Sequence, residues 1–351
     1  MNQNDFSING RLIGAGQRTY IIAELSANHC HSFEQACEIV QLAKSAGADA
    51  IKLQTYTADT ITIDCEREPF IIQYGTVWDG QRLYDLYDQA HTPWDWQPKL
   101  KKLANDIGLD LFSSPFDNSA VDFLETMEVP AYKVASFEIV DTGLLKRIAQ
   151  TGKPTIVSTG MSTLEEIDRA VQTLKDNGCP QIALLKCTSA YPAPPESMNL
   201  QTIPELARRF GVPVGLSDHT LTHESAIASV ALGGCIIEKH LTRSRKDGGP
   251  DAGFSLEPNE FAEMVQSVRT TELALGHAKF GPSSSDAGNR SFRRSLFVVA
   301  KIRQGEEFTE ENVRSIRPGQ GLEPRFLDEV LGKTATQDVE RGTPLAWKHV
   351  A

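Results

Sequence analysis

The chain has 351 residues, of which 40% are hydrophobic and 23% are charged, a composition typical of a globular protein with one large or two medium domains. Its formal net charge of -11 argues against nucleic acid or an anionic membrane as a partner, so an anionic ligand needs a local group of basic residues. The chain has no apolar stretch of membrane-spanning length, no signal-peptide core at its start and no CxxC pair among its six cysteines, which predicts a cytoplasmic protein with reduced, mostly buried thiols.

Short apolar runs recur along the first 240 residues, most of them followed by polar or glycine residues and then by a helical pattern. The runs are continuously apolar rather than alternating, as parallel strands covered on both faces are. They lie at residues 20–25, 49–55, 109–114, 131–136, 154–159, 182–187, 212–217 and 235–240. Eight strand–helix units predict a (β/α)8 TIM barrel. The alternative, an open doubly wound sheet, would favour a glycine-rich turn after the first strand, and the sequence has none there.

The helical patterns between the runs carry recognisable ends. The segment 32–47 opens on Ser32 with Gln35 three residues later, which predicts a capping box, and it stops at a glycine. The segment 163–178 also ends at a glycine, and the closing helix runs from Pro258 to Gly276.

One connection, residues 56–108, is much longer than a barrel loop requires, and loops of this length usually have a function. It contains three of the four tryptophans, at positions 78, 94 and 96. These rings either form an aromatic wall over a sugar-sized site or pack the insertion onto the barrel.

The composition and the pattern of the sequence change after the closing helix. Residues 277–289 have the composition of a linker, and residues 290–351 show short strands and glycine turns with little helical periodicity. We therefore predict a barrel domain at residues 1–276, a linker at 277–289 and a small β-rich domain at 290–351.

Polar side chains gather at the carboxyl ends of the predicted strands, the edge at which TIM barrels build their sites. Lysines at this edge of an acidic protein indicate an anionic ligand, and neighbouring serine hydroxyls suit phosphate or carboxylate. Alternatively, each lysine forms a solvated rim charge or an ion pair with Glu24 or Glu238. The set comprises Glu24, Lys52, Gln54, Ser113, Ser114, Lys133, Ser136, Ser158, Thr159, Lys186, Thr188, Ser189, Ser217, Asp218, His219, Glu238 and His240.

His219 and His240 end the seventh and eighth predicted strands, which are neighbours in a barrel wall. Adjacent strands lie about 4.8 Å apart, so both imidazoles can reach one ion. Two imidazoles with oxygen ligands suit Mn, Co, Zn or Fe better than Ca. A competing pair, His219 and His223, has helical spacing but lacks the glutamate of an HExxH motif.

Four further positions carry weaker signals, because each suits either chemistry or a helix cap or turn. Glu24 and Asn28 lie at and just after the first strand, Glu138 follows the fourth, and Asp251 lies in the loop beyond the eighth. Each is a possible general acid, general base or hydroxyl ligand.

The chain resembles the sialic acid synthase family over nearly its whole length. The segments that carry the resemblance are AELSANH, GADAIKLQTY, SSPFD, YKVASFE, STGMST, LKCTSAYP, GLSDHT and IEKH, together with RPGQGL, which is like that family's antifreeze-like (SAF) domain. The resemblance implies a TIM barrel followed by a SAF domain that is swapped onto the partner's barrel in a homodimer. It also implies a condensation of phosphoenolpyruvate with an N-acetylated amino sugar that depends on a divalent metal.

The resemblance further assigns roles by motif. The metal, preferably Mn2+ with Mg2+ and Co2+ as alternatives, would be held by His219 and His240. Glu24, Lys52, Lys133 and Glu138 would form the catalytic set. The substrates would be bound by Asn28, Ser114, Ser136, Ser158, Ser189, Tyr191, Ser217 and Asp251 and by Arg317 of the partner chain. Cys30 and His31 stand where the family has a small residue and glycine, which leaves the geometry of that loop open.

Within the family, AELSANH and the long insertion look most like the members that use 2,4-diacetamido-2,4,6-trideoxy-L-altrose. Ser189 stands where members that use N-acetylmannosamine have asparagine, which argues against that sugar. The alternative is the same chemistry on another amino sugar, giving N-acetylneuraminate or legionaminate. A metal-dependent aldolase or isomerase without phosphoenolpyruvate and a non-enzymatic glycan-binding protein are more distant alternatives.

Overall fold

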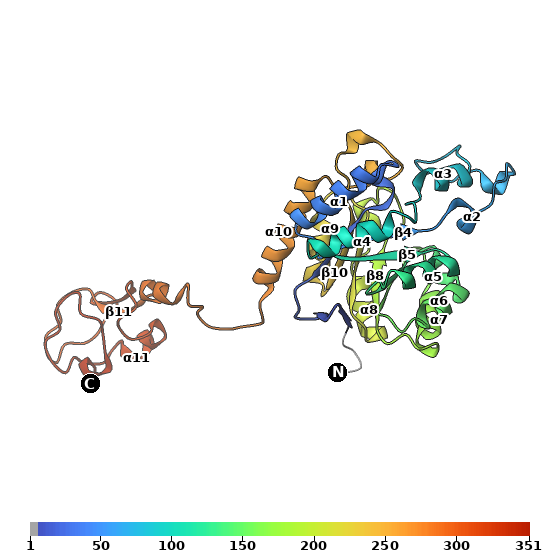
Figure 1. The fold of residues 1–351 in the computed structure, drawn as a ribbon. Coiled ribbons are helices and arrows are strands. Elements are labelled where there is room, and N and C mark those ends of the chain that lie inside the picture. The colour runs from blue at the N-terminus through green and yellow to red at the C-terminus, as the bar shows by residue number, and fades with distance from the viewer. Residues whose placement is uncertain (1–5) are drawn as a thin grey trace. The chain divides into compact units, whose positions relative to one another are not determined.

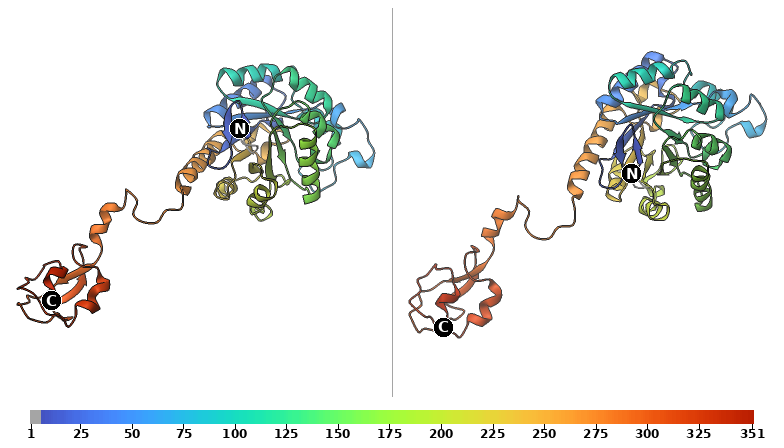
Figure 2. Two further views of the ribbon diagram at one scale, coloured as in Figure 1. Left: turned by 90° about the horizontal axis from the view of Figure 1, so that it is seen from below. Right: turned by 60° about the horizontal axis from the view of Figure 1, so that its bottom comes forward.

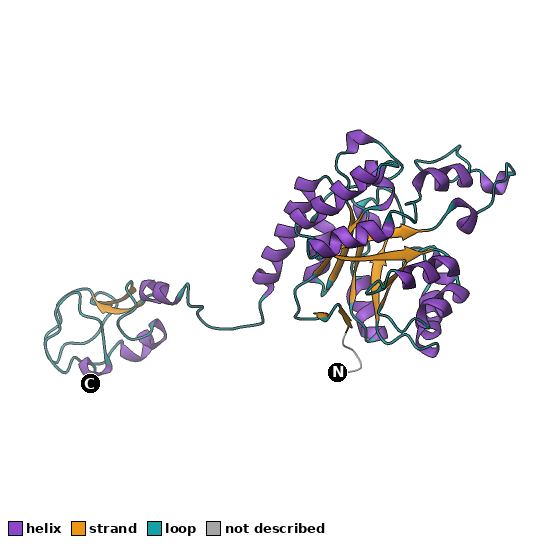
Figure 3. Cartoon of the chain, viewed as in Figure 1, coloured by secondary structure: helices purple, strands orange, loops and turns teal. Residues whose placement is uncertain are grey.

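The computed structural model describes residues 6–351, so the first five residues of the predicted barrel domain lie outside the described part. The chain forms two compact units, of which the first ends at Gly276 and the second spans His277–Ala351. The first unit confirms the predicted fold: it is a closed barrel of parallel strands in the order β10-β3-β4-β5-β6-β7-β8-β9 (Figures 1 and 3). The strands follow one another around the wall in chain order, so β10 closes the ring against β3.

Each predicted apolar run corresponds to one barrel strand. The strands are β3 (Tyr20–Glu24), β4 (Ala50–Thr55), β5 (Asp110–Pro115), β6 (Tyr132–Val134), β7 (Thr155–Ser158), β8 (Ile182–Cys187), β9 (Val214–Asp218) and β10 (Ile236–His240). They are buried along almost their whole length, because one face fills the barrel and the other contacts helices. The carboxyl ends of all eight strands therefore meet at one rim.

Helices form the outer layer around the strands, as two further views show (Figure 2). They are α1 (Phe33–Ser45), α4 (Gln97–Asp106), α5 (Asn118–Thr126), α6 (Thr142–Ala149), α7 (Leu164–Asp176), α8 (Thr202–Phe210), α9 (Glu224–Ala231) and α10 (Pro258–Leu275). The capping box predicted at α1 is only half formed. Ser32 Oγ accepts the Gln35 N–H at 3.1 Å, but the Gln35 amide donates to Asn28 O at 2.7 Å instead of returning to Ser32.

A hairpin of β1 (Phe6–Ile8) and β2 (Arg11–Ile13) precedes the barrel. Phe6, Ile8 and Ile13 are buried in the same apolar core as the strands. The Ser7 N–H donates to Gln181 Oε1 at 2.8 Å, just before β8 begins, so the hairpin lies at the amino-terminal end of the barrel, opposite the rim where the strands end.

The long insertion is partly helical. It contains α2 (Ala58–Ile61), a 3-10 turn at Glu68–Phe70 and α3 (Leu83–Ala90) before α4 begins. An isolated bridge between Ile71 and Arg82 ties its two arms together.

The second unit has its own small core. Strands β11 (Ser295–Val298) and β12 (Val313–Ile316) pair antiparallel, and a short helix α11 (Leu327–Val330) follows. Its buried cluster is built from Leu296, Val298, Ile302, Phe308, Val313, Val330, Ala335, Val339 and Leu345. A 3-10 helix at Ala287–Phe292 spans the end of the predicted linker.

Two expectations from composition can be compared with the structure. Within residues 6–351 no helix is both long and apolar enough to cross a membrane. All six cysteines are free thiols, but only Cys179, Cys187 and Cys235 are buried, so the prediction that most are buried is wrong. Cys30 is exposed because it lies in the loop after β3, outside the barrel wall.

Candidate functional site

Two buried lysines lie inside the mouth of the barrel and alternate with two carboxylates. Lys52 and Lys133 are only 3% and 2% exposed. Lys52 Nζ lies 2.6 Å from Glu24 Oε2 and 3.7 Å from Glu238 Oε1, and Lys133 Nζ lies 3.7 Å from Glu238 Oε2. The arrangement is produced by register, because Glu24 of β3 stands opposite Lys52 of β4. The alternative of ion pairing is therefore realised for both lysines.

The same lysines also contact serines on their neighbouring strands. Lys52 Nζ donates to Ser114 Oγ at 3.3 Å, and Lys133 Nζ donates to Ser158 Oγ at 2.7 Å. Lys186 has no carboxylate partner in the described chain and donates to Cys187 O at 2.7 Å. Ammonium and hydroxyl groups therefore share one cradle, as the binding of a phosphorylated or carboxylated anion requires.

Burial shapes the charge of this cradle. It raises the pKa of Glu24 to about 7, although Lys52 opposes the rise. Burial also acts to raise the pKa of Glu238, but the charges of Lys133 and Lys52 outweigh it and hold that pKa below its usual value. The pKa of Lys133 is lowered by burial. Glu24 is thus the carboxyl in the cradle that can exchange a proton near neutral pH.

The hydroxyls of Ser136 and Ser189 both lie beside Gly160, the second residue after β7. Ser136 Oγ accepts the Gly160 N–H at 3.1 Å. A Cβ atom at Gly160 would lie 2.7 Å from Ser136 Oγ and closer still to Ser189 Oγ, so a side chain fits there only if both hydroxyls move away. Gly160 is part of the STGMST segment, but its contact with these two hydroxyls depends on the fold and could not be predicted from the segment alone.

The two predicted metal ligands face one another. The ring centroids of His219 and His240 are 5.3 Å apart. His219 Nδ1 lies 2.9 Å from Thr188 O, which suits an Nδ1–H donor and leaves Nε2 as a free ligand. His240 Nδ1 is buried without a hydrogen-bond partner among residues 6–351. His223, the member of the competing pair, instead lies at the start of α9.

The residues present fit a divalent ion held by two imidazoles. The described part of the chain has no group of three or more His, Cys, Asp or Glu side chains arranged to hold a metal. An ion on His219 and His240 would therefore complete its shell with oxygens of water or substrate.

An aromatic wall stands beside the histidines. The Tyr191 ring lies 4.5 Å from His219, and the Phe254 ring lies 5.0 Å from His240. Trp78 of the insertion lies 5.7 Å from Tyr191, and its indole N–H donates to Pro250 O at 3.1 Å.

The three tryptophans of the insertion divide between the two predicted roles. Trp78 lies against the wall beside the site. Trp94 stacks on Phe123 at 4.7 Å, and Trp96 packs against Phe33 at 5.7 Å. The prediction of an aromatic wall therefore fits Trp78, and the alternative, packing of the insertion onto the barrel, fits Trp94 and Trp96.

The loop after β3 is held by its own polar groups. Asn28 is fully buried, and its amide donates to Leu241 O at 3.0 Å and to Ser255 Oγ at 2.9 Å. Cys30 and His31 have φ angles of 47° and 55°, in the left-handed region that favours glycine, which accounts for the glycine expected in this loop.

The remaining predicted residues belong to separate strands and loops. Asp251 Oδ2 accepts from Ser26 Oγ and from the Ala27 N–H, and burial raises the pKa of Asp251. Glu138 follows β6, its Oε2 has no partner among residues 6–351, and burial raises its pKa to about 7. Ser217 is buried in β9 beside Glu238 in register. Arg317 belongs to the second unit, just after β12.

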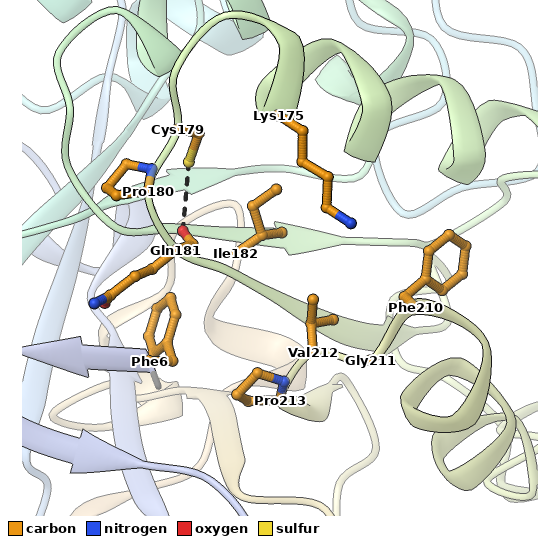
Figure 4. A pocket seen from close by; sticks show the side chains of 10 residues that line it. All are labelled: Phe6, Lys175, Cys179, Pro180, Gln181, Ile182, Phe210, Gly211, Val212 and Pro213. Carbon is orange, nitrogen blue, oxygen red and sulfur yellow. Dashed lines mark hydrogen bonds between the residues drawn. The ribbon is translucent and has the colours of Figure 1, made fainter. Parts of the chain in front are cut away.

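Two recesses lie in the first unit. One, of about 400 Å³, is lined by Trp78, Leu86, Tyr191, Pro250 and Phe254 among others and adjoins the aromatic wall. The other, of about 100 Å³, lies between Phe6 of the hairpin and the start of β8, where Cys179 Sγ contacts Gln181 O at 3.4 Å (Figure 4). None of the predicted site residues lines this second recess.

Comparison with known proteins gives consistent matches over the whole chain. The model of the NeuB family matches residues 39–280, and that of the SAF domain matches residues 293–351. A pseudaminic acid synthase of Campylobacter jejuni is 45% identical over 94% of this chain and 96% of its own length. An N,N'-diacetyllegionaminic acid synthase of the same organism is 34% identical over 92% and 97%. The crystal structure of a spore coat polysaccharide biosynthesis protein from Bacillus subtilis superposes with a TM-score of 0.67 at 32% identity, covering 99% of both chains.

Proposed function

The chain belongs to the NeuB family and ends in a SAF domain, and from this premise we propose that it catalyses the pseudaminic acid synthase reaction. It is an enzyme of the nonulosonic acid synthase type, a transferase. The substrates are phosphoenolpyruvate, 2,4-diacetamido-2,4,6-trideoxy-L-altrose and water, and the products are pseudaminic acid and phosphate. The observation that carries the proposal is the buried lysine–serine cradle beside two facing histidines at the barrel mouth. The higher identity to the pseudaminic acid synthase than to the legionaminic acid synthase supports the choice of sugar.

Phosphoenolpyruvate binds in the cradle. Its carboxylate and phosphate take the place of Glu24 and Glu238 as partners of Lys52 and Lys133, with hydroxyls of the neighbouring serines as further donors. Lys186, which has no carboxylate partner in the described chain, adds a third cation for this ligand.

The condensation forms one carbon–carbon bond and one carbon–oxygen bond, to the added water, and breaks the carbon–oxygen bond to phosphate. The methylene carbon of phosphoenolpyruvate attacks the aldehyde carbon of the open-chain sugar, and positive charge develops at the pyruvyl carbon. Water adds to that carbon and gives a proton to Glu24, whose pKa of about 7 suits a general base. Of the two protons of this water, one ends on the former aldehyde oxygen, which becomes a hydroxyl, and the other ends on the departing phosphate. Phosphate then leaves from the same carbon, and the lysines stabilise its charge.

A divalent metal is the expected cofactor. Held by His219 and His240, an ion such as Mn2+, with Mg2+ or Co2+ as alternatives, would polarise the sugar aldehyde as a Lewis acid. The free Nε2 of His219 and the unpartnered Nδ1 of His240 support this assignment.

A second copy of the chain completes the mouth in this proposal. Apolar side chains on three loops of the rim are exposed: Phe137 after β6 by 58%, Met161 after β7 by 60% and Leu221 after β9 by 47%. Exposed apolar side chains grouped in this way are typical of a surface that another protein surface covers. The SAF domain of the partner is the expected cover, and it would bring the partner's Arg317 to the sugar.

Turnover tests the reaction directly. Purified protein is incubated with phosphoenolpyruvate and, in parallel, the diacetamido sugar, its legionaminate counterpart and N-acetylmannosamine, with and without a chelator. We expect phosphate release and a product of pseudaminic acid mass from the first sugar, lost with chelator and restored by Mn2+. Phosphate release with another sugar alone would assign a different synthase, and turnover without phosphoenolpyruvate would assign an aldolase.

A further inference from the structure

The larger of these two recesses lies outside the cradle, and of the predicted substrate-binding residues only Tyr191 lines it. It has a volume of about 400 Å³, within the roughly 300–1,000 Å³ typical of small-molecule sites. Three separate segments build it: the insertion with Trp78 and Leu86, the loop after β8 with Tyr191, and the loop after β10 with Phe254. The hydrogen bond from Trp78 to Pro250 O joins the first segment to the third.

The recess shares a wall with the site of the chemistry. Tyr191 and Phe254 line the recess, and their rings also contact His219 at 4.5 Å and His240 at 5.0 Å. Trp78, on the far side, lies 5.7 Å from Tyr191 and 6.3 Å from Phe254. A ligand whose reactive atom lies at the histidines therefore has this recess within reach of its distal end.

The residues that line the recess indicate which chemical group the distal end of the ligand carries. It contains no charged side chain, and most of its members are aromatic, aliphatic, proline or glycine. Its polar side-chain groups include the amides of Gln81 and Gln89, which are exposed and can exchange water for a ligand, and the hydroxyl of Tyr191. A neutral group with a methyl end and an amide suits this lining, whereas a phosphate or carboxylate would lack a cation.

We propose that this recess is the subsite for the acetamido substituent farthest from the sugar aldehyde, with the methyl against Trp78 and Phe254 and the amide at Gln81 and Gln89. The inference rests on the proposed function and deepens it, because it assigns selection of a second N-acyl group to the insertion.

A substitution that fills the recess tests the assignment without disturbing the fold. Gly253 lines the recess, its φ lies outside the left-handed region, and a Cβ there meets no atom within 4 Å. Gly14, at the hairpin, has the same two properties at the other end of the barrel and serves as the control. The variants Gly253→Leu and Gly14→Leu are compared with the wild type in steady-state kinetics with the diacetamido sugar and phosphoenolpyruvate.

We expect Gly253→Leu to raise KM for the diacetamido sugar about tenfold or more, a loss of uniform binding, while KM for phosphoenolpyruvate and all constants of Gly14→Leu stay within about twofold. A second readout is tryptophan fluorescence: the change on adding the sugar alone should be lost in Trp78→Phe and kept in Trp94→Phe, whose indole also donates to a backbone carbonyl, Tyr56 O.

The outcomes separate the two claims. Turnover of the diacetamido sugar by the wild type, with an unchanged KM in Gly253→Leu, would overturn the subsite and leave the proposed function intact. A changed oligomeric state of Gly253→Leu in light scattering would also overturn the subsite, because the recess would then seat a partner chain. Absence of turnover by the wild type with this sugar would overturn both.

Discussion

Lys239 stands between two site residues, Glu238 and His240, yet its side chain lies on the other face of β10, because neighbours in a strand point to opposite sides. It is fully buried, and its Nζ lies 2.8 Å from Asp218 Oδ2 and 3.0 Å from Thr222 O. The ammonium group therefore holds the segment after β9, and with it the backbone that carries His219.

Removing this ammonium should leave Asp218 buried without its ion partner. We expect Lys239→Met to lower the free energy of unfolding by about 3–5 kcal/mol, the usual cost of breaking a buried pair from one side. The measurement is urea unfolding followed by fluorescence. Lys102→Met is the control, because the Lys102–Asp106 pair is exposed, and its midpoint should match the wild type. Equal midpoints for the two variants would contradict the expectation.

Glu138 should make stability depend on pH. Its pKa is about 7 in the folded chain against 4.5 for a free side chain, because it is buried. The folded state therefore binds the proton more tightly, so this contribution is fully present below pH 4.5 and is lost as pH rises through about 7.

The size of this effect follows from the shift, at about 3 kcal/mol between the two limits. Glu138→Gln should remove that part of the pH dependence, so that its free energy of unfolding gains on the wild type between pH values of about 5 and 8. Urea unfolding at several pH values checks this. Glu263→Gln, at an exposed position of α10, should run parallel to the wild type, and a parallel Glu138→Gln curve would refute the assignment.

At the scale of elements, the barrel could be predicted because each strand is a continuous apolar run that ends on polar residues. Those ends share one rim in a parallel barrel, so Glu24, Lys52 and Lys133 could be placed together before any contact was known. The contacts that join distant loops could not be predicted in this way. Asn28, predicted to bind substrate, uses its amide on Leu241 O, and Trp78 differs from Trp94 and Trp96 only through its partners.

The turn after β7 allows a test of whether Gly160 determines the positions of two hydroxyls in the proposed site. Gly160→Ala places a methyl group against the hydroxyls of Ser136 and Ser189, which can rotate away because they end short side chains. We expect little loss of stability but about a tenfold rise in KM for phosphoenolpyruvate. Thermal unfolding and kinetics together check this, with Gly14→Ala as the control at an open glycine. An unchanged KM would show that these hydroxyls do not touch that substrate.

At the scale of the whole molecule, the chain has two separate cores, and the proposed site draws on both units through a second copy. Subunit mixing tests this. His240→Asn removes a residue of the barrel mouth, and Arg317→Ala removes one of the second unit. If Arg317 acts on the partner's barrel, each mixed dimer keeps one intact site.

Each variant alone should be nearly inactive, and their co-expression should restore roughly one quarter of wild-type activity, because half of the dimers are mixed. No recovery in confirmed mixed dimers would place Arg317 in its own chain's site, and full activity of Arg317→Ala alone would place it outside any site. Affinity tags of two kinds identify the mixed dimers.

The hairpin at the amino-terminal end has a consequence for the order in which the two substrates bind. Because Phe6, Ile8 and Ile13 pack into the core at that end, we expect both substrates and both products to pass through the rim at the carboxyl ends of the strands. Lys52 and Lys133 are almost fully buried, whereas the recess beside Trp78 includes the exposed Val77, so we expect a sugar that binds first to block access to the lysines. The enol phosphate should therefore arrive before the sugar, and product-inhibition kinetics should give the pattern of an ordered rather than a random sequence.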